Sequence, residues 1–459
     1  MKTVLKIVNA ALPLQDERQL YTLVAEDGVW LSVTEQPSPT SSPDSVSLEQ
    51  WDGESGDPGA LLLLDAGGNV VLPGFVDAHM HLDKAFSLPK VGNVSGTLQE
   101  AVLNYSTAVP SFTKRELKAR MMRAALQAIS FGTTVMRTHL DFHVKYGKDV
   151  ALRTIEAALE VKEELAAYAT LQLFPMLPYL DLTSDALELA EEVLRMGVTG
   201  LGGAPHLSPF PNPDIDRLFA LADRLGCPID LHTDESDDPC KNTVLHIARR
   251  TMEYGWAGRV TVDHLCSLAA MPDADAEAAI SLMAEAKLGA VTLPGANLYL
   301  QGRHDGFPAR RGVTRVKELL AAGIPLATAS DNIHDPFHPF GRGDLLQIGL
   351  VTAYAAHMGS PSDIRTVLRM MTTQAAQVAG LARYGIAAGN AADFVIFDAA
   401  AVEELFTMVP ERRWVWSKGL CVKKPGGKPE WKQRVLKERW DEASELITFR
   451  SESADAVKS

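Results

Sequence analysis

Cysteine is scarce in this sequence. The 459 residues include four, Cys227, Cys240, Cys266 and Cys421, which lie far apart and form no CxxC pair. A secreted domain held by disulfides is therefore not expected, and reduced thiols in a cytoplasm fit better. No apolar run is long enough to span a bilayer, and the N-terminus lacks the apolar core and small-residue cleavage site of a signal peptide. The sequence predicts a cytoplasmic protein with no membrane partner.

Acidic residues outnumber basic residues in this sequence. The chain has 44 Lys and Arg against 58 Asp and Glu, which gives a formal net charge of −14. Binding to nucleic acid needs a concentrated basic surface, so no nucleic-acid partner is expected. A homo-oligomer is compatible with the sequence.

From residue 71 onward, short apolar runs alternate with amphipathic stretches. The stretches 114–132, 184–197, 215–226 and 313–323 are typical of helices and end in glycine. Strand followed by helix, eight times over, predicts an α/β fold of the TIM-type (β/α)8 barrel class over residues 71–384. A doubly wound open sheet is the alternative, although it usually has fewer strands. The eight runs are 70–82, 133–142, 169–177, 198–205, 228–235, 259–267, 290–297 and 325–332.

The two chain ends return to β-like runs, at 2–10 and 20–33 and again at 384–400 and 413–424. We therefore expect residues 1–70 and 385–459 to form one small β domain beside the barrel. Within it, residues 35–60 are rich in Ser, Pro, Gly and Asp and are expected to form a mobile surface loop.

Histidines and an aspartate stand at the ends of the expected strands. His79 and His81 end the first strand, His232 the fifth and Asp331 the eighth. Residues i and i+2 of a strand face the same way, and all strand C-termini of a barrel meet at one mouth. Three imidazoles and a carboxylate there suit one divalent ion, Zn²⁺ or Fe²⁺, with a position left for water. His139, in the second strand, could line the mouth without an assigned role.

Each of these residues also has an ordinary structural interpretation. An HxH pair alone is weak evidence, Asp331 could cap a following helix, and His264 could be a hydrogen-bonded core residue. Their joint placement on strand ends 1, 5, 6 and 8 favours a site. Glu235, three residues after His232, could be a solvated loop carboxylate. Above a metal it could instead carry a proton from the attacking water to a leaving nitrogen, while His264 holds the attacking oxygen. The fourth strand ends in "GGAPHL", with no lysine that could be carbamylated between two metals, so one ion is favoured.

Two longer segments of the expected barrel are "LYLQGRHDGFPARRGVTRVKELL" and "DNIHDPFHPFGRGDLLQ". With most of the expected barrel, they resemble the amidohydrolase superfamily and, within it, bacterial cytosine deaminases, and these two segments are the more specific parts of the resemblance. It implies a barrel flanked by a β-sandwich built from both chain ends. It also implies metal ligands at His79, His81, His232 and Asp331, with Asp331 also catalytic. Glu235 would be the proton shuttle, His264 would orient the hydroxide, and Gln301 and Arg303 would belong to the mouth.

The sequence departs from that branch at positions expected to contact substrate. Met176 stands where cytosine deaminases carry a glutamine, and a thioether cannot replace its paired donor and acceptor. Asn332 replaces a second aspartate, and Lys84 replaces a threonine. A site changed at its hydrogen-bonding positions usually rejects the original ligand. The substrate is therefore expected to differ from cytosine, and Lys84 would suit an oxygen-rich, partly anionic ring.

The expected activity is hydrolytic removal of ammonia or an alkylamine from a small nitrogen heterocycle. Cleavage of a cyclic or linear amide by the same residues is the alternative within enzyme chemistry. A catalytically inactive barrel used for binding is disfavoured, because the metal and acid–base residues are all present.

Overall fold

The computed structural model describes residues 4–16, 18–40, 45–48, 50–51, 61–177, 182–411, 413–426 and 434. The chain divides into two compact units. One comprises Met1–Gly74, Ser130–Gly132 and Arg383–Ser459, and the other comprises Phe75–Ile129 and Thr133–Ala382.

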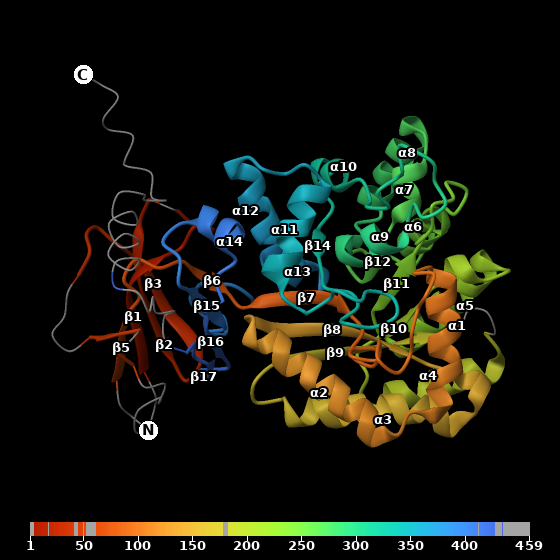
Figure 1. Ribbon diagram of the computed structural model, residues 1–459, viewed down its shortest axis with the longest axis horizontal. Helices are drawn as coiled ribbons and strands as arrows, with labels where there is room; N and C mark the ends of the chain where they lie inside the picture. The colour runs from red at the N-terminus through yellow and green to blue at the C-terminus, as the bar shows by residue number, and fades with distance from the viewer. Residues whose placement is uncertain are drawn as a thin grey trace. The chain divides into compact units, whose positions relative to one another are not determined.

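The larger unit is built on eight parallel strands in sequence order (Figure 1). A bridge between Met80 and Asp331 joins the last strand to the first. Because the sheet closes on itself, the prediction of a TIM-type barrel is confirmed, and a doubly wound open sheet is excluded. The strands are β7 (Phe75–Met80), β8 (Thr133–Asp141), β9 (Thr170–Leu177), β10 (Leu201–Gly203), β11 (Ile229–Thr233), β12 (Val260–His264), β13 (Gly289–Thr292) and β14 (Leu326–Thr328).

Amphipathic helices connect these strands. In α4 (Ser184–Met196), the apolar residues at helical spacing are buried, Thr183 caps the first turn, and Gly197 ends the helix with a φ of 109°. None of the helices in the described ranges has the length and apolar character of a membrane span. The others in this unit are α1 (Leu98–Ala108), α2 (Lys114–Ser130), α3 (Lys148–Glu164), α5 (Pro211–Leu225), α6 (Thr243–Glu253), α7 (Cys266–Ala270), α8 (Asp273–Glu285), α9 (Pro294–Leu300), α10 (Val316–Ala321), α11 (Leu345–Ala355), α12 (Pro361–Met370) and α13 (Thr373–Val378).

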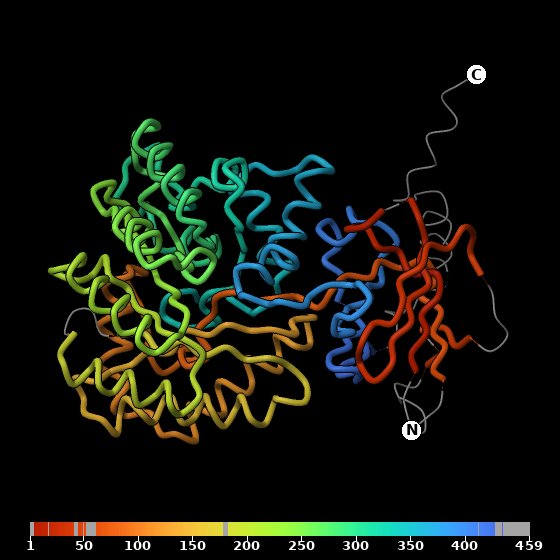
Figure 2. The backbone as a smooth tube through the Cα atoms, turned by 180° about the vertical axis from the view of Figure 1, so that it is seen from behind, coloured from red at the N-terminus to blue at the C-terminus, as the bar shows by residue number. Residues whose placement is uncertain are grey.

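The smaller unit contains two sheets drawn from both chain ends. Figure 2 shows their red N-terminal and blue C-terminal segments side by side. One sheet has the order β3-β2-β1-β5-β4 and the other β17-β16-β15-β6, and a shared apolar core includes Trp30, Trp51, Phe394 and Trp416. The elements are β1 (Val4–Ala11), β2 (Leu20–Glu26), β3 (Val29–Gln36), β4 (Val46–Ser47), β5 (Leu61–Asp65), β6 (Val71–Pro73), β15 (Phe394–Phe397), α14 (Val402–Met408), β16 (Arg413–Ser417) and β17 (Leu420–Lys423).

The segment expected to be a mobile loop, residues 35–60, is only partly described. Residues 41–44, 49 and 52–60 lie outside the described residues. The described part includes β4, which pairs with β5, and the buried residues Leu48 and Trp51. The Trp51 ring stacks on Trp416 with centroids 5.2 Å apart. These apolar side chains hold part of the polar segment against the core.

Candidate active site

The barrel interior is polar toward its mouth. Alternate residues of a strand point to one side, and on β8 these are Arg137, His139 and Asp141. Arg137 donates to Asp230 of β11 and to Thr261 of β12, deep within the barrel. The guanidinium thus neutralises buried carboxylate charge below the histidines.

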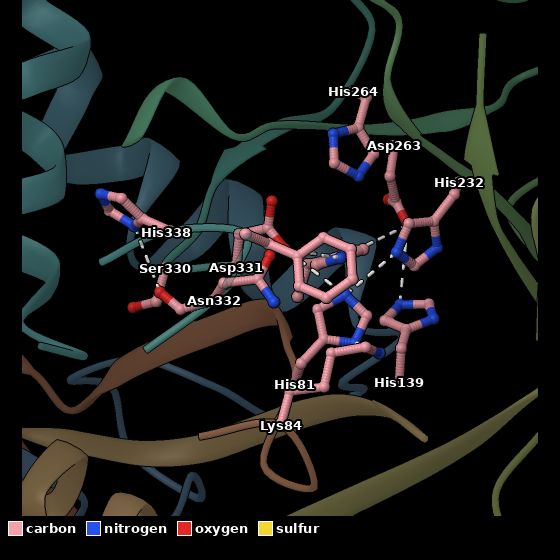
Figure 3. A network of polar contacts seen from close by, with 12 residues as sticks. His81, Lys84, His139, His232, Asp263, His264, Ser330, Asp331, Asn332 and His338 are labelled. Atoms are coloured by element: carbon pink, nitrogen blue, oxygen red, sulfur yellow. Dashed lines mark hydrogen bonds and ion pairs between the residues drawn. The ribbon is translucent and has the colours of Figure 1, made fainter. Parts of the chain in front are cut away.

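Above this layer, His79, His81, His232 and Asp331 converge, and we call these four residues the ligand cluster. His81, His232 and Asp331 of this cluster are labelled in Figure 3. His81 Nε2 lies 3.1 Å from His232 Nε2. Asp331 Oδ1 lies 3.5 Å from His79 Nε2 and 3.4 Å from His81 Nε2. The structure therefore brings together the four residues that the sequence predicted as metal ligands. No helix begins at Asp331; α11 begins after Asp344, which caps it instead.

The cluster has the donor atoms of a metal site. His79 Nε2 and both carboxylate oxygens of Asp331 are buried and make no hydrogen bond within the described part of the chain. Buried polar atoms are normally paired, so a common partner for these atoms is expected. Imidazole nitrogens and a carboxylate oxygen are the ligands that Zn²⁺ and Fe²⁺ accept. The residues fit a divalent metal ion.

Two residues with no predicted role orient His79. Its Nδ1 is 2.8 Å from Asp263 Oδ2, and its ring stacks on His139 with centroids 4.1 Å apart. Burial alone would lower the pKa of His79, but the charges of Asp263 and Asp331 outweigh it and raise the pKa to about 10. In a protein holding a metal, such an outer hydrogen bond fixes the ring so that the opposite nitrogen faces the ion.

His79, His139, His232 and Asp263 form a second group of potential ligands. It shares His79 and His232 with the ligand cluster, and it includes Asp263, to which His79 Nδ1 is already hydrogen-bonded. A chelating role for this deeper group would compete with the outer hydrogen bond of His79.

His264 and Glu235 lie beside the ligand cluster. His264 ends β12 with a φ of 64°, which turns its side chain away from the strand alternation. Its Nδ1 is 3.0 Å from Asn297 Nδ2, and its Nε2 is buried without a hydrogen-bond partner among the residues described. Burial lowers the pKa of His264 to about 3. Glu235 Oε1 lies 3.6 Å from His264 Nδ1.

The Glu235 carboxyl is not a solvated loop group. Its side chain is 10% exposed, and burial, reinforced by the charge of Asp331, raises its pKa to about 8. The neighbouring acids are also engaged. Asp234 accepts three hydrogen bonds at the start of α6, and Asp237 accepts one from Gly302 N. Glu235 is thus a carboxyl that can hold a proton near neutral pH.

Lys84 is buried against the ligand cluster. Its Nζ lies 3.0 Å from His81 Nδ1 and donates to Asp141 Oδ1 over 2.6 Å. Burial would lower the pKa of Lys84, but the carboxylates of Asp141 and Asp83 raise it. The ammonium is therefore a paired buried cation next to one predicted ligand. The rings of Tyr105 and Phe337 complete its surroundings.

The other predicted substrate contacts lie at different depths. Met176 is half-buried on β9 and shares a face with Phe174, whose ring lies near Arg137. Asn332 directly follows the ligand Asp331 and donates to Asp335 over 2.8 Å.

Gln301 and Arg303 lie on the chain that follows α9. The Gln301 side chain packs at Gly312, and its backbone N donates to Asn297 O. Arg303 stacks over Tyr299 and donates to Ser95 O. These contacts join neighbouring loops, and none of them is with the ligand cluster.

Known proteins resemble this chain in sequence and in fold. The model of the amidohydrolase family matches residues 63–157 and 153–422. A pterin deaminase of Rhizobium rhizogenes is 34% identical over 370 residues, which is 80% of this chain and 83% of that protein. The N-isopropylammelide isopropyl amidohydrolase of Pseudomonas sp. (strain ADP) is 30% identical over 374 residues, which is 79% of this chain and 86% of that protein. The crystal structure of 5-methylcytosine deaminase from Klebsiella pneumoniae, liganded with phosphonocytosine, has a TM-score of 0.83 and 28% identity, covering 94% of this chain and all (100%) of that chain.

Proposed function

Because this chain belongs to the amidohydrolase family, as its resemblance predicted, we propose that it removes ammonia or an alkylamine from an aminated nitrogen heterocycle by metal-dependent hydrolysis. The observation that carries the proposal is the meeting of the ligand cluster with Glu235 and His264 at one end of the barrel. The metal is one Zn²⁺ or Fe²⁺ ion held by His79, His81, His232 and Asp331. When bound, it supplies the Lewis acidity that makes water nucleophilic near neutral pH.

The side chains around the ion move the protons. Water oxygen bonds to the ring carbon that bears the exocyclic nitrogen, and the bond between that carbon and nitrogen then breaks. Glu235 takes a proton from the water and delivers it to the departing nitrogen, which leaves as ammonia or amine. A pKa of about 8 gives Glu235 access to both protonation states near neutral pH. His264 holds the attacking oxygen by donating a hydrogen bond to it. This bond also stabilises the negative charge that develops on that oxygen.

The substrate is proposed to be a pterin or an oxygenated triazine rather than cytosine. Two relatives that are at least 30% identical are a pterin deaminase and an N-isopropylammelide hydrolase. The thioether of Met176 cannot form the paired donor and acceptor hydrogen bonds that an amide side chain makes to cytosine. Lys84 and Asn332, in contrast, carry hydrogen-bond donors beside the ligand cluster. These donors favour a ring with carbonyl or anionic oxygens. Gln301 and Arg303 are proposed to shape the mouth from the loop after α9. Cytoplasmic location and assembly into a homo-oligomer remain predictions.

A panel of aminated pyrimidines, purines, pterins and triazines tests this function. The protein is loaded with Zn²⁺ or Fe²⁺, and released ammonia and alkylamine are measured. Release from a pterin or a triazine above that from cytosine is expected. Equal activity on cytosine would contradict the proposal that Met176 and Asn332 disfavour cytosine as the substrate. A new carboxylate without amine loss from a ring would instead support amide cleavage.

Glu235→Gln tests the proton transfer. We expect metal to be retained and turnover to fall by about 10²- to 10⁴-fold, the usual contribution of a general acid–base group. Glu253→Gln, an exposed residue of α6, is the matched control and should behave as wild type. Near-normal turnover in Glu235→Gln would refute the role of Glu235.

A further inference from the structure

Asn297 of α9 is the hydrogen-bond partner of His264. Its Nδ2 lies 3.0 Å from His264 Nδ1, and its side chain is fully buried. Glu235 Oε1 is 3.6 Å from the same nitrogen, which is beyond hydrogen-bond distance. Asn297 is therefore the residue that determines whether His264 Nδ1 carries a proton.

The hydrogen-bonding capacity of the Asn297 amide gives the direction of this bond. The amide nitrogen that faces His264 is Nδ2, and an amide NH₂ group can only donate. Asn297 Oδ1 is buried and has no hydrogen-bond partner within the described ranges. Nδ2 therefore donates, and His264 Nδ1 accepts.

Acceptance at Nδ1 decides where the proton of His264 lies. A neutral imidazole carries one N–H, so the proton must be on Nε2. This nitrogen is buried without a partner in the described part of the protein. Figure 3 shows the His264 ring directed toward Asp331, His81 and His232. Its N–H is thus presented where the attacking oxygen would lie.

The backbone around Asn297 is held in place. Asn297 O accepts a hydrogen bond from Gln301 N over 3.0 Å. Gly312, with a φ of +68°, packs so closely that a Cβ on it would meet Gln301 Cβ at 2.2 Å and Asn297 O at 3.0 Å. The loop after α9 therefore fixes the amide that faces His264, which gives Gln301 a structural task.

We propose that Asn297 is a positioning residue that fixes the tautomer of His264, so that Nε2–H donates to the attacking oxygen. With the proton on Nε2, the hydrogen bond strengthens as negative charge develops on that oxygen. With the proton on Nδ1, the Nε2 lone pair would face the same oxygen and repel it. The kinetic consequence rests on the proposed function, but the tautomer does not.

The tautomer can be read by ¹⁵N NMR of histidine-labelled protein, metal-free and zinc-loaded. The signals of His264 are identified by their loss in His264→Gln. We expect Nδ1 unprotonated and Nε2 protonated in the wild type. In Asn297→Asp the new carboxylate only accepts, so Nδ1 should become protonated. A wild-type protein with the proton on Nδ1 would overturn the proposal, whatever its substrate.

Steady-state kinetics then measure how much the tautomer of His264 contributes to kcat. Asn297→Leu removes the donor at similar volume, and kcat should fall by about 10- to 100-fold with KM and metal content little changed, as for other residues that orient a functional histidine. Asn104→Leu, a half-exposed residue of α1, is the matched control. Wild-type kcat and tautomer in Asn297→Leu would refute the role of Asn297. If Asn297→Leu does not fold, the spectra of the wild type and Asn297→Asp still decide.

Discussion

Asp263 Oδ2 lies 2.8 Å from His79 Nδ1, and neither side chain is exposed to solvent. An ionised carboxylate only accepts, so His79 donates from Nδ1. Its Nε2 is then directed at Asp331 and the rest of the ligand cluster. This contact between β12 and β7 orients one metal ligand before any metal binds.

Asp263→Asn should weaken metal binding. The amide is a poorer acceptor and carries no charge, so the orientation and basicity of His79 both decline. Loss of such an outer partner typically lowers metal affinity by about 10- to 100-fold. Competition with a fluorescent zinc chelator measures the affinity. Asp216→Asn, on α5 and bonded to Arg250 and His246, is the control and should bind zinc as the wild type does. Unchanged affinity in Asp263→Asn would contradict the orienting role.

Metal affinity should depend steeply on pH. A pKa of about 10 keeps His79 protonated in the metal-free protein at neutral pH. A metal must displace that proton, so affinity should rise by about tenfold for each unit of pH below that pKa. Dissociation constants measured from about pH 6 to about pH 9 test the slope. In Asp263→Asn the same rise should level off at lower pH, because one of the charges that raise the pKa of His79 is gone.

The ligand cluster could be predicted because two regularities suffice for it. Side chains two apart on a strand share a face, which pairs His79 with His81. Strand ends of a closed barrel meet, which brings His232 and Asp331 to them. Both rules can be applied once hydrophobic periodicity has located the strands, and each of the eight predicted runs overlaps one strand of the barrel. The first run, 70–82, also includes β6 of the smaller unit.

Asp263 and Asn297 could not be found by those rules. Asp263 and His264 are adjacent, so alternation places them on opposite faces, and the φ of 64° at His264 overrides it. A non-glycine residue in this region is uncommon and is not signalled by its type. Asn297 lay in the run 290–297, but β13 ends at Thr292 and α9 begins at Pro294. The strand expected over that whole run was wrong, because proline favours the first turn of a helix.

The buried pair of Lys84 and Asp141 should matter for stability. Their side chains are 4% and 16% exposed, and Lys84→Met would leave Asp141 with the contact to His143 Nε2, 3.0 Å away, but without the ammonium. Removing one partner of a buried pair typically costs about 3–5 kcal/mol of unfolding free energy. Urea unfolding of the metal-free protein measures the change.

Two comparisons separate this charge effect from lost packing. Lys84→Met with Asp141→Asn should be less destabilised than Lys84→Met alone, since residue 141 then carries no charge that has lost the Lys84 ammonium. Lys90→Met breaks a more exposed pair with Glu116, 47% and 30% exposed, and should cost less than about 1 kcal/mol. Equal losses in Lys84→Met and the double variant would argue against the ion pair as the cause.

Glu235 should make the metal-free protein less stable as pH rises. Its pKa is raised from 4.5 in the unfolded chain to about 8 in the folded protein, chiefly by burial. Between those values the folded state holds a proton that the unfolded state has lost. The stability from this group is therefore complete below about pH 4.5 and is lost as pH rises through about 8. Urea unfolding at several values from about pH 5 to about pH 8 should show the decline in wild type and a flatter profile in Glu235→Gln. Glu253→Gln should keep the wild-type profile. If Glu235→Gln does so as well, the buried carboxyl is not the group that titrates.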